Sequence, residues 1–383
     1  MTEPALTTTD ARPYMICRRC VMDTSDPEIR FDDAGYCNHC SDALDQMDDV
    51  WRRGEDGERT FTAKIEEIRE HRRGEFDSIL GLSGGVDSSY LAHAAVSRGL
   101  KPLVVHIDAG WNSEIAVANV HSLVSKLGLE LVTQVIPWDE MRDLQLAYLR
   151  AGVANQDTPQ DHSLFAGLLR LAAKHRVKYV LNGWNFASES ILPPAWGYSA
   201  RDGKQLRAIH SRFGSKPLKD FPVLTYRRYY IEYLGRRQLK LVQPLNWLAY
   251  DPLEARALLE RELGWRDYGG KHTESRWTKF FQHYYLPTYF GYDKRRAHLS
   301  SLIVAGQLKR DEAMVTMEHE PYDPHEVEIE KDFIARKLGV SLEEFNALLA
   351  GKKHSWSDYP NDEKFDRLVR DPRLAGLKRR IKG

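Results

Sequence analysis

The chain has 383 residues, and its 55 Lys and Arg side chains balance its 55 Asp and Glu side chains. Its content of 42% hydrophobic and 29% charged residues is ordinary for a globular protein, which excludes a wholly disordered chain and one that binds nucleic acid through overall positive charge. No apolar stretch approaches the roughly 18 residues of a membrane span, and the first residues lack a secretory signal, so we expect a cytoplasmic protein without disulfides.

Short apolar runs alternate with helical patterns between residues 60 and 265. The predicted strands are 76–82, 101–110, 129–136 and 177–183, and the predicted helices are 60–72, 88–100, 114–127, 138–150 and 161–175. Such alternation is typical of βαβ units, in which helices cover both faces of a parallel sheet. We therefore predict an α/β fold with a Rossmann-like parallel sheet for residues 60–265.

The flanking segments have a different character. Residues 1–13 are polar and rich in Thr, which favours a disordered extension. Residues 193–222 are rich in Pro and Gly and predict a long excursion from the sheet. Residues 266–383 are predicted to form a mostly helical C-terminal region, in which Ser341 is an expected N-cap.

All four cysteines lie in two CxxC knuckles within residues 14–45. They are Cys17, Cys20, Cys37 and Cys40. Two tight turns of this kind bring four thiolates together into a closed tetrahedral site, which predicts a small zinc ribbon with a structural Zn²⁺ ion. An iron–sulfur cluster is the alternative ligand. If all four thiolates bind metal, no cysteine is left to hydrolyse glutamine or to carry a persulfide.

A glycine-rich loop, SGGVDSS, joins the first predicted strand to the next helix. Its glycines let backbone N–H groups approach phosphate oxygens, and the helix N-terminus attracts an anion. Unlike a Walker A loop, it has no Lys before its hydroxyl residues, and it carries an acid. This favours a pyrophosphate group bound with a metal. The predicted nucleotide contacts are Ser83, Gly84, Gly85, Val86, Asp87, Ser88 and Ser89.

The loop resembles the pyrophosphate (PP) loop of the N-type ATP pyrophosphatases, which adenylate a substrate and release pyrophosphate. The resemblance implies that ATP also contacts the loops after the second and fourth strands, at His106, Ile107, Asp108, Gly183, Asn185 and Glu189. It further implies that Asp87 and Glu189 hold Mg²⁺, because hard oxygen ligands suit that ion. From the residues alone, Glu189 is equally well a solvated acid, and Asp108 a helix cap.

The knuckles and the loop together are similar to the N-acetyl sugar amidotransferase family. The similarity runs from about residue 14 to 315 and includes MICRRCVMDTSDPEIRFDDAGYCNHC, SILGLSGGVDSSYLA and RWTKFFQHYYLPTYFGYDKRRAHLSSLIVAGQLKRDEAM. The family makes amidino sugars for bacterial surface polysaccharides, such as the lipopolysaccharide O-antigen. The resemblance implies that an acetamido group of a nucleotide-linked N-acetyl sugar, for instance a UDP-diacetamido uronate, becomes an acetamidine. The amide oxygen would take AMP from ATP, and ammonia would then displace that AMP.

The resemblance also implies a separate source of ammonia. An N-terminal glutaminase needs a cysteine directly after the initiator Met, and this chain has Thr2 there. We expect a glutaminase subunit of the imidazole-glycerol-phosphate-synthase type, together with that enzyme's cyclase-like partner. Neither a membrane nor a nucleic acid is an expected partner.

Basic and aromatic residues are dense in the segment 271–300. Because Arg and Lys bind phosphate and carboxylate groups, we predict that Lys271, Arg276 and Lys294 assist catalysis and that Arg295 contacts the nucleotide. A solvated helix face or a docking surface for a partner explains any one of them equally well.

Two other functions fit part of the pattern. A tRNA-thiolating enzyme also joins CxxC modules to this loop, but the neutral net charge and the lack of a spare cysteine oppose it. A nucleotide-binding scaffold that assembles a glutaminase complex without catalysis is the second alternative.

Overall fold

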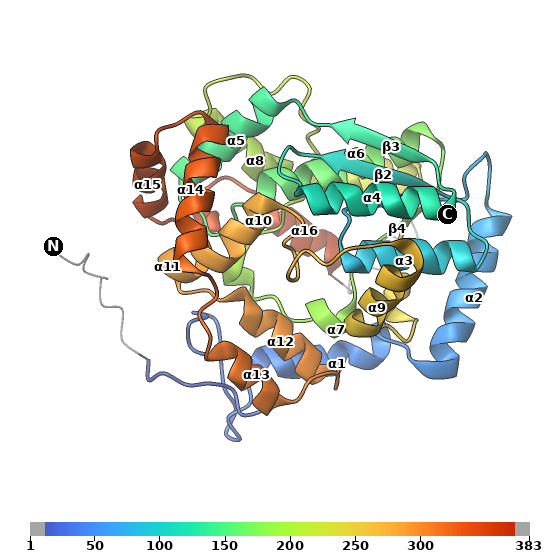
Figure 1. Ribbon diagram of the computed structural model, residues 1–383, viewed down its shortest axis with the longest axis horizontal. Coiled ribbons are helices and arrows are strands. Elements are labelled where there is room, and N and C mark those ends of the chain that lie inside the picture. The colour runs from blue at the N-terminus through green and yellow to red at the C-terminus, as the bar shows by residue number, and fades with distance from the viewer. Residues whose placement is uncertain (1–11, 372–383) are drawn as a thin grey trace.

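The computed structural model describes residues 12–371, and Figure 1 shows their arrangement around a central sheet. The predicted extension at 1–13 lies outside the described residues except for its last two. Of these, Arg12 donates hydrogen bonds to the carbonyls of Pro27 and Ile29, at 2.7 and 3.1 Å. No helix in the range 12–371 is long and apolar enough to cross a membrane.

Five parallel strands form the sheet, in the order β3-β2-β1-β4-β5. They are β1 (Ser78–Gly81), β2 (Pro102–Asp108), β3 (Leu131–Val135), β4 (Tyr179–Leu181) and β5 (Lys240–Val242). The strand order reverses at β1, which pairs with β2 on one side and with β4 on the other. This is a doubly wound sheet, in which ligands bind at the carboxyl ends of the strands beside the point of reversal. The predicted α/β fold with a parallel sheet is confirmed.

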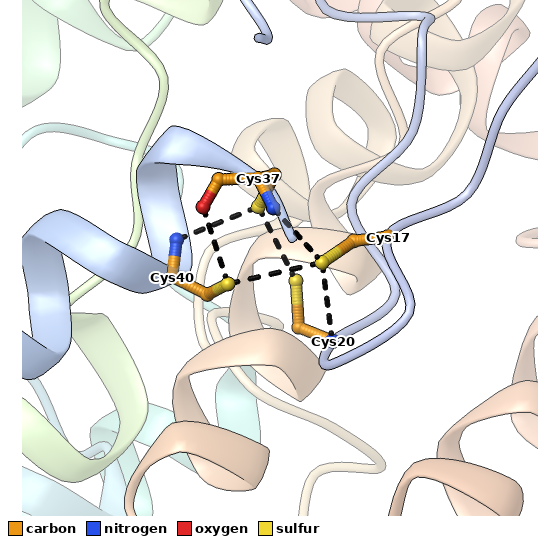
Figure 2. Close-up of side chains that lie close together, drawn as sticks. All are labelled: Cys17, Cys20, Cys37 and Cys40. Atoms are coloured by element: carbon orange, nitrogen blue, oxygen red, sulfur yellow. Dashed lines mark hydrogen bonds between the residues drawn. The ribbon is translucent and has the colours of Figure 1, made fainter. Parts of the chain in front are cut away.

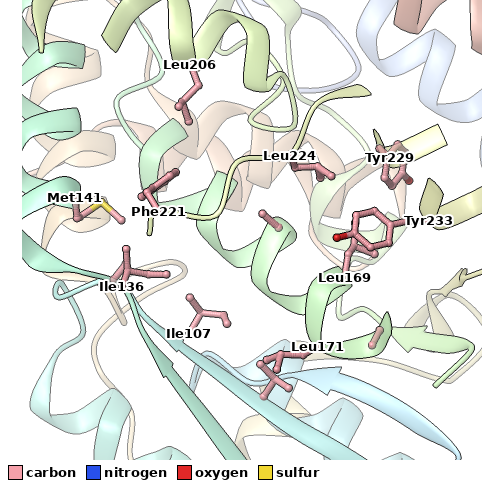
Figure 3. Close-up of a cluster of buried hydrophobic side chains, with 14 of the residues drawn as sticks. Ile107, Ile136, Met141, Leu169, Leu171, Leu206, Phe221, Leu224, Tyr229 and Tyr233 are labelled. Atoms are coloured by element: carbon pink, nitrogen blue, oxygen red, sulfur yellow. The ribbon is translucent and has the colours of Figure 1, made fainter. Parts of the chain in front are cut away.

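Helices cover both faces of the sheet. On one face lie α2 (Gly54–Glu70), α3 (Val86–Ser97), α4 (Glu114–Leu127) and α9 (Pro252–Leu263); on the other lie α5 (Trp138–Ala151), α6 (Thr158–Lys174) and α8 (Gly203–Phe213). Neighbouring strand residues point to opposite faces. Ile79 therefore packs in the α5–α6–α8 layer, part of which Figure 3 shows, whereas Leu80 packs in the other.

Several elements of this domain were not predicted, among them β5, α8 and a π-helix. Strand β5 has three residues, too few for a periodic signal, and its pairing with β4 places it in the sheet. The predicted excursion at 193–222 contains α8, which starts because the Asp202 side chain accepts hydrogen bonds from the first N–H groups of the helix. A π-helix, η2 (Arg228–Arg236), follows.

The cysteine knuckles are attached to the C-terminal region. Helix α1 (Asn38–Val50) begins at the second knuckle and packs on α12 (Lys294–Val304). The Arg310 guanidinium, on α13 (Arg310–Met317), donates hydrogen bonds to the carbonyls of Cys17 and Cys20 at 3.0–3.2 Å. The knuckles, α1, α12 and α13 therefore pack together, in the lower part of Figure 1.

The C-terminal region is mostly helical, as predicted. Its other helices are α10 (Arg276–Phe280), the π-helix η4 (Phe281–Tyr285), α11 (Leu286–Phe290), α14 (Pro324–Leu338), α15 (Leu342–Ala350) and α16 (Glu363–Arg370). The expected N-cap is confirmed, because the Ser341 side chain accepts a hydrogen bond from the Glu344 N–H at 3.0 Å.

Candidate active site

The glycine-rich loop follows β1, at the carboxyl edge where the strand order reverses. Gly84 has a φ of +86°, and a Cβ added there would lie 2.5 Å from the Ala116 carbonyl oxygen. A side chain is therefore excluded by both conformation and space. The indole N–H of Trp265 donates a hydrogen bond of 2.9 Å to the Gly84 carbonyl and fixes the loop.

The first turn of α3 begins directly after these glycines. Gly85 is the N-cap, and its N–H donates to the Ser83 hydroxyl at 3.2 Å. The Ser83 and Ser88 hydroxyls are 3.2 Å apart, and Ser88 also donates to the Gly85 carbonyl. The loop thus presents hydroxyl groups and helix N–H groups on one edge, an arrangement that suits an anion.

The loop after β4 lies against the glycine-rich loop. A Cβ at Gly183 would lie 3.3 Å from the Ser88 backbone nitrogen, so the two loops touch through backbone atoms. Asn185 is buried and caps the short helix α7 (Phe186–Glu189) by accepting a hydrogen bond from the Ser188 N–H at 3.0 Å. The cap orients Glu189 at the end of that helix.

A lysine ammonium joins the two loops. The Nζ atom of Lys271 lies 3.3 Å from Asp87, 3.0 Å from Glu189 and 2.7 Å from the Ser188 hydroxyl. The three charged side chains are 19–25% exposed. The Tyr250 hydroxyl donates a hydrogen bond to the other oxygen of Asp87. The structure therefore brings together three predicted site residues, Asp87, Glu189 and Lys271.

The charged side chains of this cluster shift one another's pKa values. Burial disfavours the charged form of Lys271, but Asp87 and Glu189 outweigh burial and raise its pKa above the usual value. Burial and the Asp87 charge raise the pKa of Glu189, against the effect of Lys271. Two carboxylates held on one ammonium supply the hard oxygen ligands that Mg²⁺ prefers, so the donor set fits this ion.

Lys294 lies at the first turn of α12, next to this cluster. Burial lowers its pKa, while the charges of Asp157, Asp161 and Glu189 act in the opposite direction. Burial raises the pKa of Asp157 to about 8 and that of Asp161 to about 6. Within residues 12–371 the Lys294 ammonium has neither a hydrogen bond nor an ion pair, which leaves it free to bind an anionic ligand.

The structure does not bring Arg276 and Arg295 into the cluster. The Arg276 guanidinium pairs with Glu330 at 2.8 Å and lies over the Phe333 ring, both on α14. Arg295 follows Lys294 on the same helix, so its side chain points about 100° away around the helix axis. It pairs with Asp293 at 2.6 Å and lines a cavity of about 380 Å³ against the knuckle module.

The predicted contacts His106, Ile107 and Asp108 are the last three residues of β2. The His106 ring donates a hydrogen bond to the Leu82 carbonyl at 2.8 Å, and Asp108 accepts one from the Gly110 N–H at 2.8 Å. The Ile107 side chain is buried in the core, 5% exposed, so only its backbone remains for a nucleotide.

Three site residues were missed from the sequence: Tyr250, Tyr268 and Glu274. The Tyr268 hydroxyl accepts a hydrogen bond from the Val86 N–H at 3.2 Å. The carboxylate of Glu274 lies beside Gly85, at 3.2 Å from the position of an added Cβ. All three lie more than 150 residues from the loop, in stretches without a motif, so no sequence signal connects them to it.

The four cysteine sulfur atoms converge, as predicted (Figure 2). All four lie within 4.8 Å of one another, with Cys17 to Cys40 at 3.7 Å and Cys20 to Cys37 at 3.6 Å. A tetrahedron with Zn–S bonds of about 2.3 Å has edges of roughly 3.8 Å, so the donor set fits Zn²⁺. Four buried protein ligands leave no open position, which indicates a structural site.

Comparison with known families identifies the C-terminal part of the chain. Residues 274–371 match the family model described as LPS biosynthesis protein WbpG-like, C-terminal domain. This segment is similar to the WbpG-like C-terminal domain, and we call residues 274–371 the WbpG-like domain. The WbpG-like domain holds Lys294 and Glu274, and the match agrees with the resemblance to enzymes of surface polysaccharides. No curated protein matches the sequence.

Among the solved structures that are similar to the chain are two synthetases. One is described as the structure of NMN synthetase from Francisella tularensis; it is 14% identical, covers 59% of this chain and 92% of that chain, and has a TM-score of 0.29. The other is the NH3-dependent NAD synthetase from Campylobacter jejuni subsp. jejuni NCTC 11168 in complex with the nitrate ion. It is 16% identical, covers 58% of this chain and 83% of that chain, and has a TM-score of 0.28.

Proposed function

We propose that the protein is an ATP-dependent, AMP-forming amidotransferase that converts an acetamido group of a nucleotide-linked N-acetyl sugar into an acetamidine. One observation carries the proposal: Lys271 bridges Asp87 and Glu189 beside a glycine-rich loop, at the sheet edge where doubly wound folds bind ligands. The WbpG-like domain supports a substrate of surface-polysaccharide synthesis.

The glycine-rich loop would bind the β- and γ-phosphates of ATP through backbone N–H groups at the start of α3. Asp87 and Glu189 would hold Mg²⁺, which neutralises phosphate charge when bound. Lys271, released from part of its ion pairing, would stabilise the departing pyrophosphate as negative charge develops on it.

The reaction would proceed by two displacements. The acetamido oxygen attacks the α-phosphate, which forms an O-adenylated imidate and breaks the bond to pyrophosphate. Ammonia then adds to the imidate carbon, gives up a proton, and AMP leaves with the former carbonyl oxygen. The protein's part is to align the amide with the α-phosphate and to stabilise charge, since no covalent bond to the chain is needed.

Ammonia would come from a separate glutaminase subunit. The chain has four cysteines, and all four lie in the knuckle cluster. No thiol is therefore left as the nucleophile of a glutaminase, or as the sulfur carrier of a tRNA-thiolating enzyme. The chain by itself would use ammonium and not glutamine.

The test is pyrophosphate release that depends on both ATP and an acetamido nucleotide sugar. Asp87→Asn should abolish this release while the zinc content and the folded far-UV spectrum stay unchanged. Asp56→Asn, an exposed acid on α2, is the matched control and should behave as the wild type. Full activity of Asp87→Asn would show that the site is assigned wrongly.

A further inference from the structure

The segment 266–275 connects α9 to α10 and lies on the glycine-rich loop; we call it the strap. Three of its side chains lie next to the residues that are proposed to bind phosphate and metal. Tyr268 accepts a hydrogen bond from the Val86 N–H, Lys271 bridges the acid pair, and Glu274 lies beside Gly85. One short segment therefore places three side chains beside the loop.

The strap has a strained backbone. Gly269 has a φ of +93°, which glycine tolerates, but His272 has a φ of +62°, which is costly for a side chain of this kind. A backbone of this kind persists only where surrounding contacts hold it. Backbone hydrogen bonds hold its two ends, from Arg266 to the Asn119 side chain and from the Ser113 N–H to the Glu274 carbonyl, both at 2.8 Å. Between these ends, Tyr268 and Lys271 hold the segment on the loop, so loss of their contacts should release its middle part.

The Tyr268 hydroxyl accepts a hydrogen bond from a backbone N–H that would otherwise be free to bind phosphate. The Val86 N–H is in the first turn of α3, where backbone donors point toward a bound anion. Its hydrogen bond to Tyr268, at 3.2 Å, satisfies that donor within the protein. A phosphate oxygen can reach the donor only after the hydroxyl has moved.

Glu274 places a carboxyl group next to the same site. Within the described chain, its buried Oε2 atom has no hydrogen-bond partner. Burial raises the pKa of Glu274 to about 7, and the charges of Asp87 and Glu189 add to this effect. A carboxylate at this position repels a phosphate, so its contact with the loop opposes anion binding.

We infer that the strap is a lid that rests on the phosphate site of the ligand-free protein and is displaced when ATP binds. Tyr268 and Glu274 compete with the pyrophosphate part of the nucleotide. Their displacement also moves Lys271 from Asp87 toward phosphate, which frees Asp87 for a metal. The inference rests on the proposed function, because it requires that ATP binds at the glycine-rich loop.

Calorimetry with inorganic pyrophosphate and the full-length protein tests the lid. Tyr268→Phe removes the competing hydroxyl and keeps the ring, so the affinity should rise about two- to tenfold, the worth of one hydrogen bond. Glu274→Gln removes the charge and should also bind pyrophosphate more tightly. Tyr36→Phe in the knuckle module and Glu260→Gln on the exposed side of α9 are the controls, with no expected change.

If both strap variants bind pyrophosphate more weakly than the wild type, Tyr268 and Glu274 support the ligand; if binding is unchanged, they do not affect it. Either result overturns the lid and leaves the proposed function intact. A wild-type protein that binds neither pyrophosphate nor ATP overturns the proposed function and the lid with it. Hydrogen exchange gives an independent measure: saturating pyrophosphate should speed the exchange of amides 266–275, and slower or unchanged exchange contradicts displacement.

Discussion

Replacing Lys271 with methionine removes an ammonium that contacts both acids of the candidate site. The side chain is 25% exposed and makes contacts of 3.3, 3.0 and 2.7 Å to Asp87, Glu189 and Ser188. Methionine keeps most of the aliphatic length but cannot donate. Without the ammonium, the two carboxylates repel each other, and one of them is expected to bind a proton.

The magnitude follows from the proposed role of the lysine. A preorganised donor that stabilises charge in the transition state is worth about 100- to 1,000-fold in kcat, or roughly 2.7–4 kcal/mol. Lys271→Met should therefore lower sugar-dependent pyrophosphate release by about that factor, with a smaller change in KM for ATP. Zinc content and thermal stability should stay close to those of the wild type, because the loop keeps its other contacts.

The assay measures pyrophosphate by a coupled enzyme at saturating ATP, Mg²⁺, ammonium and acetamido nucleotide sugar. Lys279→Met is the matched control, since Lys279 is 42% exposed and pairs with Glu326 on α14, away from the acid pair. It should retain full activity. If Lys271→Met stays within about threefold of the wild type, Lys271 does not stabilise the leaving group, and the account of the charged cluster is wrong.

Further substitutions test the loop and the zinc site. Gly84→Ala forces a side chain to within 2.5 Å of the Ala116 carbonyl oxygen at a φ of +86°, so it should lower the free energy of unfolding by about 1–3 kcal/mol and abolish pyrophosphate binding. The control is Gly74→Ala, which has open space around it and should change the free energy of unfolding by under about 0.5 kcal/mol. Thermal melts measure the stability of both variants, and calorimetry measures their pyrophosphate binding. The protein should contain one zinc ion per chain by elemental analysis, and Cys37→Ser should lower both the zinc content and the melting temperature, because the metal holds together the module on which Arg310 docks. An iron–sulfur absorption band, or an unchanged melting temperature in that variant, would contradict this assignment.

The sequence predicted the parts of the site that have local signals. The strand, the glycine-rich loop and the start of α3 are contiguous, so composition and periodicity locate them without tertiary information. Gly84 and Asp87 were found in this way, as were the paired knuckles around Cys17 and Cys37. Helix α4 was predicted with its observed bounds, and in the structure the Ser113 side chain caps its start and Gly128, with a φ of +62°, ends it.

The rest of the site depends on tertiary packing that leaves no local pattern. Tyr250 and Tyr268 reach the loop because α9 packs on α3, a contact that no spacing in the sequence encodes. Lys294 and Arg295 are neighbouring basic residues that the sequence does not distinguish. The orientation of α12 in the fold decides which of the two side chains lies near the carboxylates of the site. Arg276 was predicted to assist catalysis, but its guanidinium pairs with Glu330, which lies 54 residues further along the chain.

The central claim is that an amide oxygen takes AMP from ATP at this loop. An acetamido nucleotide sugar labelled with ¹⁸O in its acetyl carbonyl tests the claim directly, with ATP, Mg²⁺ and ammonium as the other reactants and mass spectrometry of the products. The account predicts AMP that carries the label, unlabelled pyrophosphate and an acetamidine sugar that has lost it. Formation of ADP, or unlabelled AMP beside the amidine product, would contradict it.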